Sequence, residues 1–343
     1  MSILVCGGAG YIGSHTCVEL LEAGDEIVVA DNLCNASEES LRRVEKITGK
    51  KVPFIKAELC SEAEVEALFA QHPGIDAVIH FAGLKAVGES VSKPLEYYSN
   101  NLISTLYLLT AMRRHGVKNF VFSSSATVYG DPATVPIRED FPTGGTTNPY
   151  GTSKLFQEKI LMDICAADPG LNVALLRYFN PIGAHESGLI GEDPNGIPNN
   201  LVPYIAKVAV GQLEKVHVYG SDYPTPDGTG VRDYIHVVDL ARGHVAALKK
   251  LDTGCGLFVC NLGTGKGYSV LDVLHAYEKA CGRTLPYSVD PRRPGDIAQC
   301  YADPAKARDE LGWEAQYGID EMCASSWKWQ SMNPNGYKGG TEQ

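Results

Sequence analysis

The sequence predicts an α/β protein with a doubly wound parallel sheet and a smaller, mixed C-terminal domain. Three observations support this fold class. A length of 343 residues allows about two domains. Short apolar runs alternate with helical patterns through the first half of the chain, as in parallel sheets that are covered on both faces. After residue 180 the composition changes to loops rich in Gly, Pro and Asn that separate short elements.

The first half of the chain contains apolar, β-rich runs that we expect to be strands. These runs cover residues 3–6, 26–30, 52–56, 77–81, 119–123 and 173–178. Between them, the spacing of apolar residues predicts helices, among them 11–23, 62–70 and 95–115. Right-handed crossovers between the strands then give a doubly wound sheet.

The second half is expected to form a smaller domain from short pieces. We expect loops at 183–200 and 221–230, a helix at 204–210, strands at 216–219 and 231–238, and mixed short elements over 258–329. Asp239 can cap a helix that runs through Leu251. We therefore divide the chain into a first domain of residues 1–180, to which a segment near 231–252 returns, and a second domain of residues 181–343.

The formal net charge of −11 argues against binding to nucleic acid or to an anionic membrane, because lysine and arginine provide affinity for phosphate backbones. An anionic small ligand would need a local positive cluster. The ten cysteines show no Cys-x-x-Cys pair, so we expect no metal site and no disulfide framework. A strand that starts at Ser2 leaves no room for a signal peptide, and no apolar run has the length of a membrane span. We therefore expect a cytoplasmic protein.

A glycine loop lies between the first expected strand and the first helix. Its spacing fits both Gly-x-Gly-x-x-Gly, with Gly8, Gly10 and Gly13, and Gly-x-x-Gly-x-x-Gly, which starts at Gly7. Glycine permits the tight turn and the close approach to a pyrophosphate in a Rossmann unit, whose helix N-terminus faces the phosphates. Asp31 ends the second strand. A carboxylate at this position can bind the adenosine ribose and repel a 2′-phosphate. Alternatively, Asp31 could cap the next helix. The sequence therefore predicts NAD rather than NADP.

A tyrosine and a lysine four residues apart open a later helix, for which Asn148 is the expected cap. Tyr150 and Lys154 project from the same face, although this spacing alone also fits an ordinary surface. A nearby ammonium and an oxidised nicotinamide would lower the pKa of the phenol, so that Tyr150 could accept a proton as hydride leaves an alcohol carbon. Ser123–Ser125 follows the fifth expected strand, where doubly wound sheets place their ligands. One of these hydroxyls could bridge Tyr150 and the reacting oxygen.

Together these features resemble the extended short-chain dehydrogenase/reductase family, and in particular its nucleotide-sugar epimerases. The similarity extends from Ser2 to about Tyr337. It rests on long, dispersed motifs, among them residues 7–16 (GGAGYIGSHT), 81–90 (FAGLKAVGES), 123–130 (SSSATVYG), 177–185 (RYFNPIGAH) and 228–236 (GTGVRDYIH).

The resemblance implies roles for individual residues. Tyr150 would be the catalytic base and acid, Lys154 would hold the nicotinamide ribose, and Ser125 would contact the sugar 4-hydroxyl. The implied NAD contacts, besides these three, are Gly7, Gly10, Tyr11, Ile12, Gly13, Asp31, Asn32, Asn35, Glu58, Leu59, Phe81, Ala82, Gly83, Lys85, Asn100 and Phe179. The implied UDP-sugar contacts, besides Ser125 and Tyr150, are Asn180, Asn200, Leu201, His217, Val218, Tyr219, Arg232, Arg293, Asp296 and Cys300.

The implied reaction is the reversible inversion of the C4 hydroxyl of UDP-glucose and UDP-galactose through a 4-keto sugar, with tightly bound NAD. The resemblance also implies a role in galactose metabolism and a homodimer that pairs two helices per subunit, here 95–115 and 150–165. Arg232 and Arg293 would form the positive cluster that a diphosphate needs in an acidic chain, because arginine can bind it through two nitrogens.

The chain departs from the usual pattern of the family at two places. Ala57-Glu58 replaces Gly-Asp at a contact to adenine, although Glu58 can still accept the hydrogen bond. Cys300 stands where some relatives carry a tyrosine beside the 2-position of the sugar. The smaller side chain suggests additional activity on UDP-N-acetylglucosamine and UDP-N-acetylgalactosamine, unless Cys300 merely packs.

Several other functions fit part of the pattern. Dehydratases of the family need an acidic pair just after the serine strand. This chain has Ala126 and Thr127 there, so we do not expect dehydration. An epimerase of UDP-glucuronate would share the mechanism and differ in its sugar pocket. A non-catalytic NAD-binding protein is expected to lack part of the Ser125, Tyr150 and Lys154 set, which is intact here. A plain dehydrogenase would consume NAD stoichiometrically.

Overall fold

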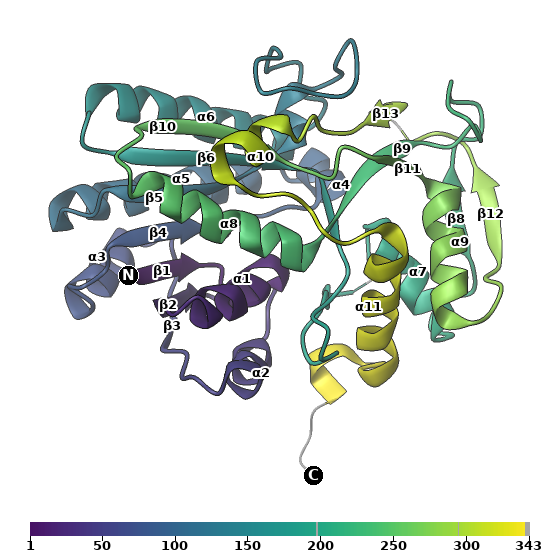
Figure 1. Cartoon of the computed structure of the whole chain (residues 1–343), viewed down its shortest axis with the longest axis horizontal. Helices are drawn as coiled ribbons and strands as arrows, with labels where there is room; N and C mark the ends of the chain where they lie inside the picture. Colours follow the sequence, from purple (N-terminus) through teal and green to yellow (C-terminus); the bar gives the residue numbers. More distant parts are fainter. Residues whose placement is uncertain (197, 294, 340–343) are drawn as a thin grey trace.

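The computed structural model describes residues 1–196, 198–293 and 295–339. Its main feature is a seven-stranded sheet in the order β10-β6-β5-β4-β1-β2-β3, in which every neighbouring pair is parallel (Figure 1). The strands are β1 (Ser2–Cys6), β2 (Glu26–Asp31), β3 (Phe54–Lys56), β4 (Ala77–His80), β5 (Asn119–Ser125), β6 (Asn172–Tyr178) and β10 (Leu257–Leu262). The predicted doubly wound parallel sheet is confirmed.

Helices cover both faces of this sheet because its strands are apolar on both sides. In β1, Ile3 and Val5 belong to one buried cluster, whereas Leu4 and Cys6 belong to another. The first cluster lies under α1 (Tyr11–Glu22), α2 (Glu38–Thr48) and α8 (Val237–Leu251). The second lies under α3 (Glu62–Gln71), α5 (Pro94–His115) and α6 (Pro149–Ala167), with the short α4 (Val87–Ser92) beside them.

The main helices begin where the sequence predicts, with one correction. The side chain of Asn148 accepts a hydrogen bond from the Gly151 amide and caps α6, as expected. Asp239 is not the cap of α8: this helix begins at Val237, and His236 accepts the capping bond from Val238. Asp239 lies in the first turn and instead accepts hydrogen bonds from two backbone amides of the C-terminal segment, at positions 316 and 317.

The second half forms smaller sheets, as expected for a mixed domain (Figure 1). A four-stranded sheet joins β7 (Asn180–Ile182), β9 (Val231–His236), β11 (Gly267–Ser269) and β13 (Gln299–Cys300), and β8 (Val216–Tyr219) pairs with β12 (Tyr287–Asp290). Around them lie α7 (Leu201–Ala209), α9 (Val270–Cys281), α10 (Ala305–Leu311) and α11 (Ile319–Met332). Two short 3-10 helices, η1 (Ala126–Tyr129) and η2 (Gly336–Gly339), complete the described elements.

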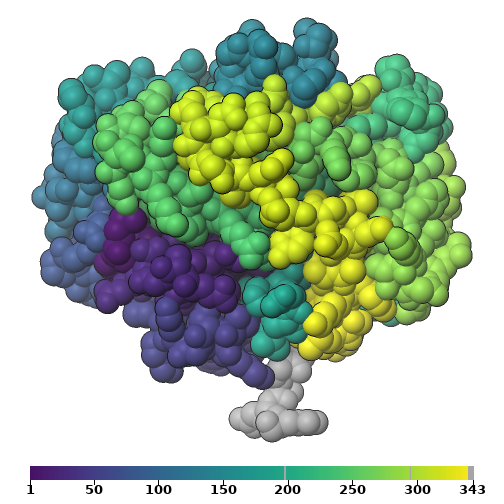
Figure 2. Space-filling model, viewed as in Figure 1, coloured from purple at the N-terminus to yellow at the C-terminus, as the bar shows by residue number. Residues whose placement is uncertain are grey.

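One strand of the main sheet was not among those expected. β10 lies beside β6 at the edge of the sheet, although β7, α7, β8, β9 and α8 separate the two strands in sequence. The chain also returns to the first half at α8, which packs against α1. Figure 2 shows α8, in green, beside the purple N-terminal region. Local sequence cannot locate such a strand, because its partner is set by a long return of the chain.

The order of the strands creates a crevice at the carboxyl end of β1. The neighbours of β1 are β2 on one side and β4 on the other. The chain proceeds from β1 to β2 and β3 on one side, and it then crosses over to β4 on the other side of β1. Ligands of doubly wound sheets bind outside the strand ends at this point. Among the described residues, no helix has the length and apolar character needed to cross a bilayer.

Candidate active site

The glycine loop is shaped by contacts between backbone atoms. Gly7 has φ +78°, and a Cβ atom placed there would lie 2.7 Å from the amide nitrogen of Ala82. A Cβ atom on Gly13 would lie 2.4 Å from the carbonyl oxygen of Gly7, and one on Gly10 would lie 3.3 Å from the same oxygen. A Cβ on Gly8 would instead meet the side chain of Val29. The geometry therefore favours the Gly7, Gly10 and Gly13 spacing of the two that fit the sequence.

The first turn of α1 is suited to an anion. Gly10 is the N-cap and no side chain caps the helix, so the amides of Tyr11, Ile12 and Gly13 face the crevice without intrahelical partners. Asp31 lies buried at the end of β2 and accepts hydrogen bonds from the amides of Ala9, at 3.2 Å, and Leu33, at 2.8 Å. Burial raises the pKa of Asp31, and the two backbone hydrogen bonds oppose this rise. The free amides of α1 suit the pyrophosphate of a dinucleotide, and the Asp31 carboxylate suits its adenosine ribose.

The expected cofactor residues gather at one edge of the sheet. They follow β1, β2, β3, β4 and β6, or lie at the end of β5 and on the neighbouring parts of α5 and α6. Asn100 is on α5, where its side-chain amide donates to the sulfur of Cys60. This shared edge is where a parallel sheet places a ligand. The structure thus brings residues from many parts of the chain to a single crevice.

The carboxylate of Glu58, one of the residues that depart from the family pattern, accepts hydrogen bonds from other residues of the chain. Its Oε2 accepts a hydrogen bond from Asn32 Nδ2 at 2.8 Å, and its Oε1 accepts one from the amide of Cys60 at 2.9 Å. Burial alone would raise the pKa of Glu58, but these hydrogen bonds outweigh it and lower the pKa. Glu58 therefore stays an ionised acceptor that orders the loop next to Asn32, and its contact with adenine remains a prediction.

Tyr150 and Lys154 project from the same face of α6 towards the end of β5. The amine of Lys154 donates to the carbonyl oxygen of Ser123 at 2.7 Å and lies 4.7 Å from the centre of the Phe122 ring. Burial lowers the pKa of Lys154 to about 7, and the carboxylate of Glu158 opposes this shift. Burial raises the pKa of Tyr150, whereas a hydrogen bond from the hydroxyl of Ser125 lowers it.

The expected activation of the phenol is therefore not provided by Lys154 alone. The structure gives the Tyr150 phenol a pKa above its ordinary value, because desolvation disfavours the phenolate. Oxidised nicotinamide, when bound, would supply a second positive charge that favours the phenolate. Within the chain, Ser125 is the group that favours the ionised phenol.

Of the three serines, Ser125 is the one available to a ligand. Ser123 and Ser124 are buried, and their hydroxyls bond to Tyr178 and Glu158 respectively. Ser125 is only half-buried and accepts a hydrogen bond from the hydroxyl of Thr127 at 3.0 Å. This pattern explains why the third serine, rather than its neighbours, can face the crevice.

The expected substrate residues lie in the second half, on several elements. Their positions are Asn180 in β7, Asn200 and Leu201 at the start of α7, His217 to Tyr219 in β8, Arg232 in β9, Arg293 and Asp296 between β12 and β13, and Cys300 in β13. Ile197 and Pro294, which adjoin two of these groups, lie outside the described residues.

Some of these residues are neighbours in space. Cys300 is paired in register with Arg232 across β13 and β9, and the guanidinium of Arg293 lies 4.9 Å from the centre of the Tyr219 ring. Arg293 also donates to Asp296 at 2.9 Å. Val218 is fully buried, so neither its side chain nor its backbone is exposed to a ligand in this structure. The expected role of Arg232 and Arg293 at a diphosphate remains a prediction.

Sequence reasoning missed two acidic residues that contact predicted site residues. Glu192 lies 3.5 Å from the amine of Lys85 and accepts a hydrogen bond from Asn200 Nδ2 at 3.2 Å. Asp290 lies 2.5 Å from Nδ1 of His217. No local motif marks either residue, because Lys85 is far from Glu192 in sequence and His217 is far from Asp290.

We expect the buried amine of Lys154 to make stability depend on pH. Its folded-state pKa is about 7, against an ordinary value of 10.5. Between these values the unfolded chain binds more protons, so the free energy of unfolding rises with pH, by at most ~1.4 kcal/mol per pH unit. Urea unfolding of the NAD-loaded protein between pH 7 and 9 should show this gain relative to Lys154→Met. Equal pH slopes for the two proteins would contradict it.

Comparisons with known proteins agree with this geometry. The model of the NAD dependent epimerase/dehydratase family matches residues 3–263. The chain is 65% identical over 338 residues to a UDP-glucose 4-epimerase of Bacillus subtilis, covering 98% of this chain and 99% of the relative.

Solved structures give the same result. A UDP-glucose 4-epimerase of Bifidobacterium longum in complex with NAD+ and UDP has a TM-score of 0.95 and 63% identity, with 98% of this chain and 100% of that chain covered. A UDP-Glc/GlcNAc 4-epimerase of Campylobacter jejuni has a TM-score of 0.84 and 37% identity, with 96% and 99% covered. The chain belongs to the NAD-dependent epimerase/dehydratase family.

Proposed function

We propose that the protein interconverts UDP-glucose and UDP-galactose by inverting the sugar at C4, with NAD retained as a resident cofactor. The observation that carries this proposal is the placement of Tyr150, Lys154 and Ser125 at the end of β5, beside a crevice that fits a dinucleotide. The relatives named UDP-glucose 4-epimerase, one of them solved with NAD+ and UDP, support it.

Each residue of the reactive group has a separate task. NAD, when bound, supplies a site that accepts a hydride from the sugar carbon and later returns it. Tyr150 takes the proton of the 4-hydroxyl at its phenolic oxygen and gives it back in the second half of the reaction. Ser125 hydrogen-bonds the same oxygen atoms, and Lys154 holds the nicotinamide ribose.

The sugar must present both faces of C4 for the configuration to invert. We propose that binding free energy comes mainly from the UDP, held by Asn180, Asn200, Arg232 and Arg293, while the sugar stays loosely held. A 4-keto sugar can then turn within the site before it is reduced on its other face. A non-catalytic NAD-binding role gains no support from this site, in which the three reactive side chains are all present.

The direct test uses purified protein without added nicotinamide. Given UDP-galactose, the protein should form UDP-glucose, read by NMR, without net formation of reduced cofactor. Tyr150→Phe should keep its NAD and lose roughly 100-fold or more of the rate, because it cannot transfer the proton. No turnover by the unaltered protein, or turnover only with added NAD, would contradict the proposal.

We also propose activity on the N-acetylated sugars. Cys300 is half-buried and opposite Arg232, so a short side chain stands in the region expected to hold the sugar. A Campylobacter jejuni relative is named for both UDP-Glc and UDP-GlcNAc, which supports a bifunctional site within the family.

Cys300→Tyr should therefore lower the rate on UDP-N-acetylgalactosamine by roughly 100-fold, since a bulky ring clashes with the acetamido group. The rate on UDP-galactose should change little. Cys300→Ala is the control and should retain both activities. Intact N-acetyl activity in Cys300→Tyr would show that Cys300 only packs.

We propose a homodimer formed by α5 and α6. Both helices expose large apolar side chains, including Leu95 and Leu106 on α5 and Phe156 on α6, and the Phe156 ring stacks on Tyr98. Exposed apolar patches of this kind mark association surfaces. We also propose a cytoplasmic location, because no disulfide joins the ten cysteines, all of which are described.

The double variant Leu106→Glu and Phe156→Glu should convert the dimer to monomers, because it places four charges in the shared surface. Light scattering gives the mass of each species. Val289→Glu changes a somewhat more exposed apolar residue on β12 and should leave the dimer intact. A monomeric unaltered protein, or a double variant that remains dimeric, would rule out this surface.

A further inference from the structure

Residues 183–195, here called the strap, cross the crevice at the carboxyl edge of the main sheet. The hydroxyl of Tyr11 donates to the carbonyl oxygen of Gly183 at 2.6 Å. The amine of Lys85 lies 3.5 Å from Glu192, and Asn195 donates to the carbonyl oxygen of Cys34 at 3.4 Å. These partners follow β1, β4 and β2, the three adjacent strands that border the crevice. The strap is therefore joined to the loops that follow all three of these strands.

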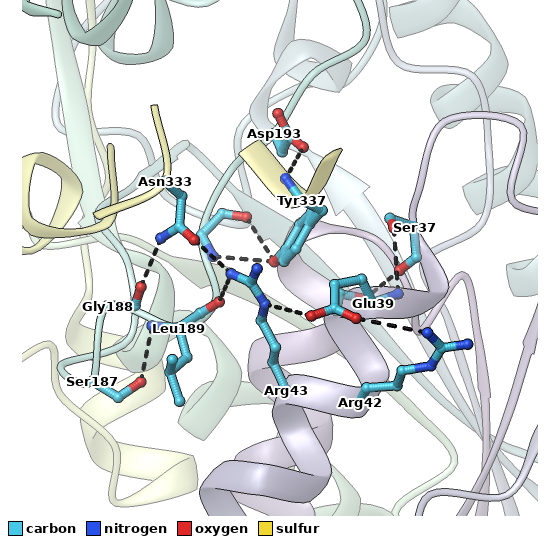
Figure 3. A network of polar contacts seen from close by, with 12 residues as sticks. Ser37, Glu39, Arg42, Arg43, Ser187, Gly188, Leu189, Asp193, Asn333 and Tyr337 are labelled. Carbon is cyan, nitrogen blue, oxygen red and sulfur yellow. Dashed lines mark hydrogen bonds and ion pairs between the residues drawn. The ribbon is translucent and has the colours of Figure 1, made fainter. Parts of the chain in front are cut away.

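The strap is fixed from its outer side by α2 and by residues 329–338 (Figure 3). The guanidinium of Arg43, on α2, donates to the carbonyl oxygen of Leu189 at 3.0 Å and to Asn333 Oδ1 at 2.6 Å. Asn333 in turn donates to the carbonyl oxygen of Gly188 at 3.0 Å. Arg43 thus joins three segments that are far apart in the sequence.

Further contacts join the strap to the C-terminal residues. The amide of Tyr337 donates to Asp193 at 2.8 Å, and its hydroxyl contacts the backbone of Gly191. The indole of Trp329 donates to the carbonyl oxygen of Glu192 at 3.2 Å. The guanidinium of Arg43 lies 5.2 Å from the centre of the Tyr337 ring and 5.7 Å from that of Trp329. In Figure 2 a small teal patch accordingly lies between the blue-purple and yellow surfaces.

We propose that the strap retains bound NAD and that Arg43 is the residue that keeps it closed. This inference rests on the proposed function, in which the cofactor stays on the protein through many turnovers. Tyr11 comes from the loop expected at the pyrophosphate, Cys34 from the loop expected at the adenosine, and Lys85 from a third loop expected to contact NAD, so the strap has a contact at each of three loops of the cofactor site. NAD can leave only when these contacts open, and Arg43 holds the middle of the strap against α2.

Arginine suits this position for a specific reason. Its planar, charged group can donate to a carbonyl and an amide oxygen while its face packs on an aromatic ring. Its side chain is nearly buried, and its remaining partner is Glu39, at 2.9 Å. The neighbouring Arg42 is a matched control, because it is exposed and, within the part of the chain that the structure describes, its ion pairs are with Glu38 and Glu39 of its own helix.

The test measures release of NAD rather than activity. NAD-loaded Arg43→Met, Arg42→Met and unaltered protein are diluted into excess fluorescent etheno-NAD, and exchange is followed over time at 25 °C. Arg43→Met should release NAD about tenfold faster or more, because both bonds to the strap and Asn333 are lost. Arg42→Met should match the unaltered protein. Thermal unfolding of each variant shows whether stability, rather than the strap, has changed.

A second variant keeps the test decisive if Arg43→Met folds poorly. Asn333→Ala removes the same connection from the other side, and it should also speed release of NAD. Release from both variants at the unaltered rate would overturn the role of Arg43, as would an equal acceleration by Arg42→Met. Rapid exchange of NAD by the unaltered protein would contradict both the proposal that NAD is a resident cofactor and the inference about the strap. Slow exchange in the unaltered protein and in every variant would contradict the inference about the strap alone.

Discussion

The close approach of Gly13 to the carbonyl oxygen of Gly7 places the first turn of α1 directly after β1. A side chain at either glycine would collide with backbone atoms, so the helix could not begin where it does. Because it begins there, its free amides face the crevice between β2 and β4, and Tyr11 reaches across to Gly183. The dinucleotide crevice and the segment that crosses it therefore depend on the same contact.

The reactive group depends in turn on a buried ion pair behind it. Arg177 of β6 and Glu158 of α6 are almost fully buried and 2.7 Å apart, and Ser124 also donates to Glu158. Burial of such a pair costs free energy, and the well-formed hydrogen bonds around it offset that cost. The pair joins α6 to the neighbouring ends of β5 and β6, and so it fixes Lys154, one turn away, against the carbonyl oxygen of Ser123.

Features encoded by short stretches of sequence could be predicted. The glycine loop with Asp31, the Asn148 cap and the spacing of Tyr150 and Lys154 are local patterns, and each can be recognised within a few residues or one strand-helix-strand unit. Features that depend on distant partners could not. Arg43 and its contact Asn333 are separated by 290 positions, and β10 joins β6 only after β7, α7, β8, β9 and α8 have intervened in the sequence. His236 caps α8, whereas the carboxylate of Asp239 accepts hydrogen bonds from the amides of residues 316 and 317, which are distant in sequence.

The central claim is that a hydrogen removed from C4 of the sugar is held within the site and returned to the same carbon. UDP-glucose that carries deuterium at C4 tests this claim directly, when it is converted by purified protein without added nicotinamide. Mass spectrometry of the UDP-galactose formed should find the deuterium retained at C4, because the site is closed to water and to free cofactor during turnover. Loss of the deuterium to solvent, or its appearance in free reduced cofactor, would contradict the claim.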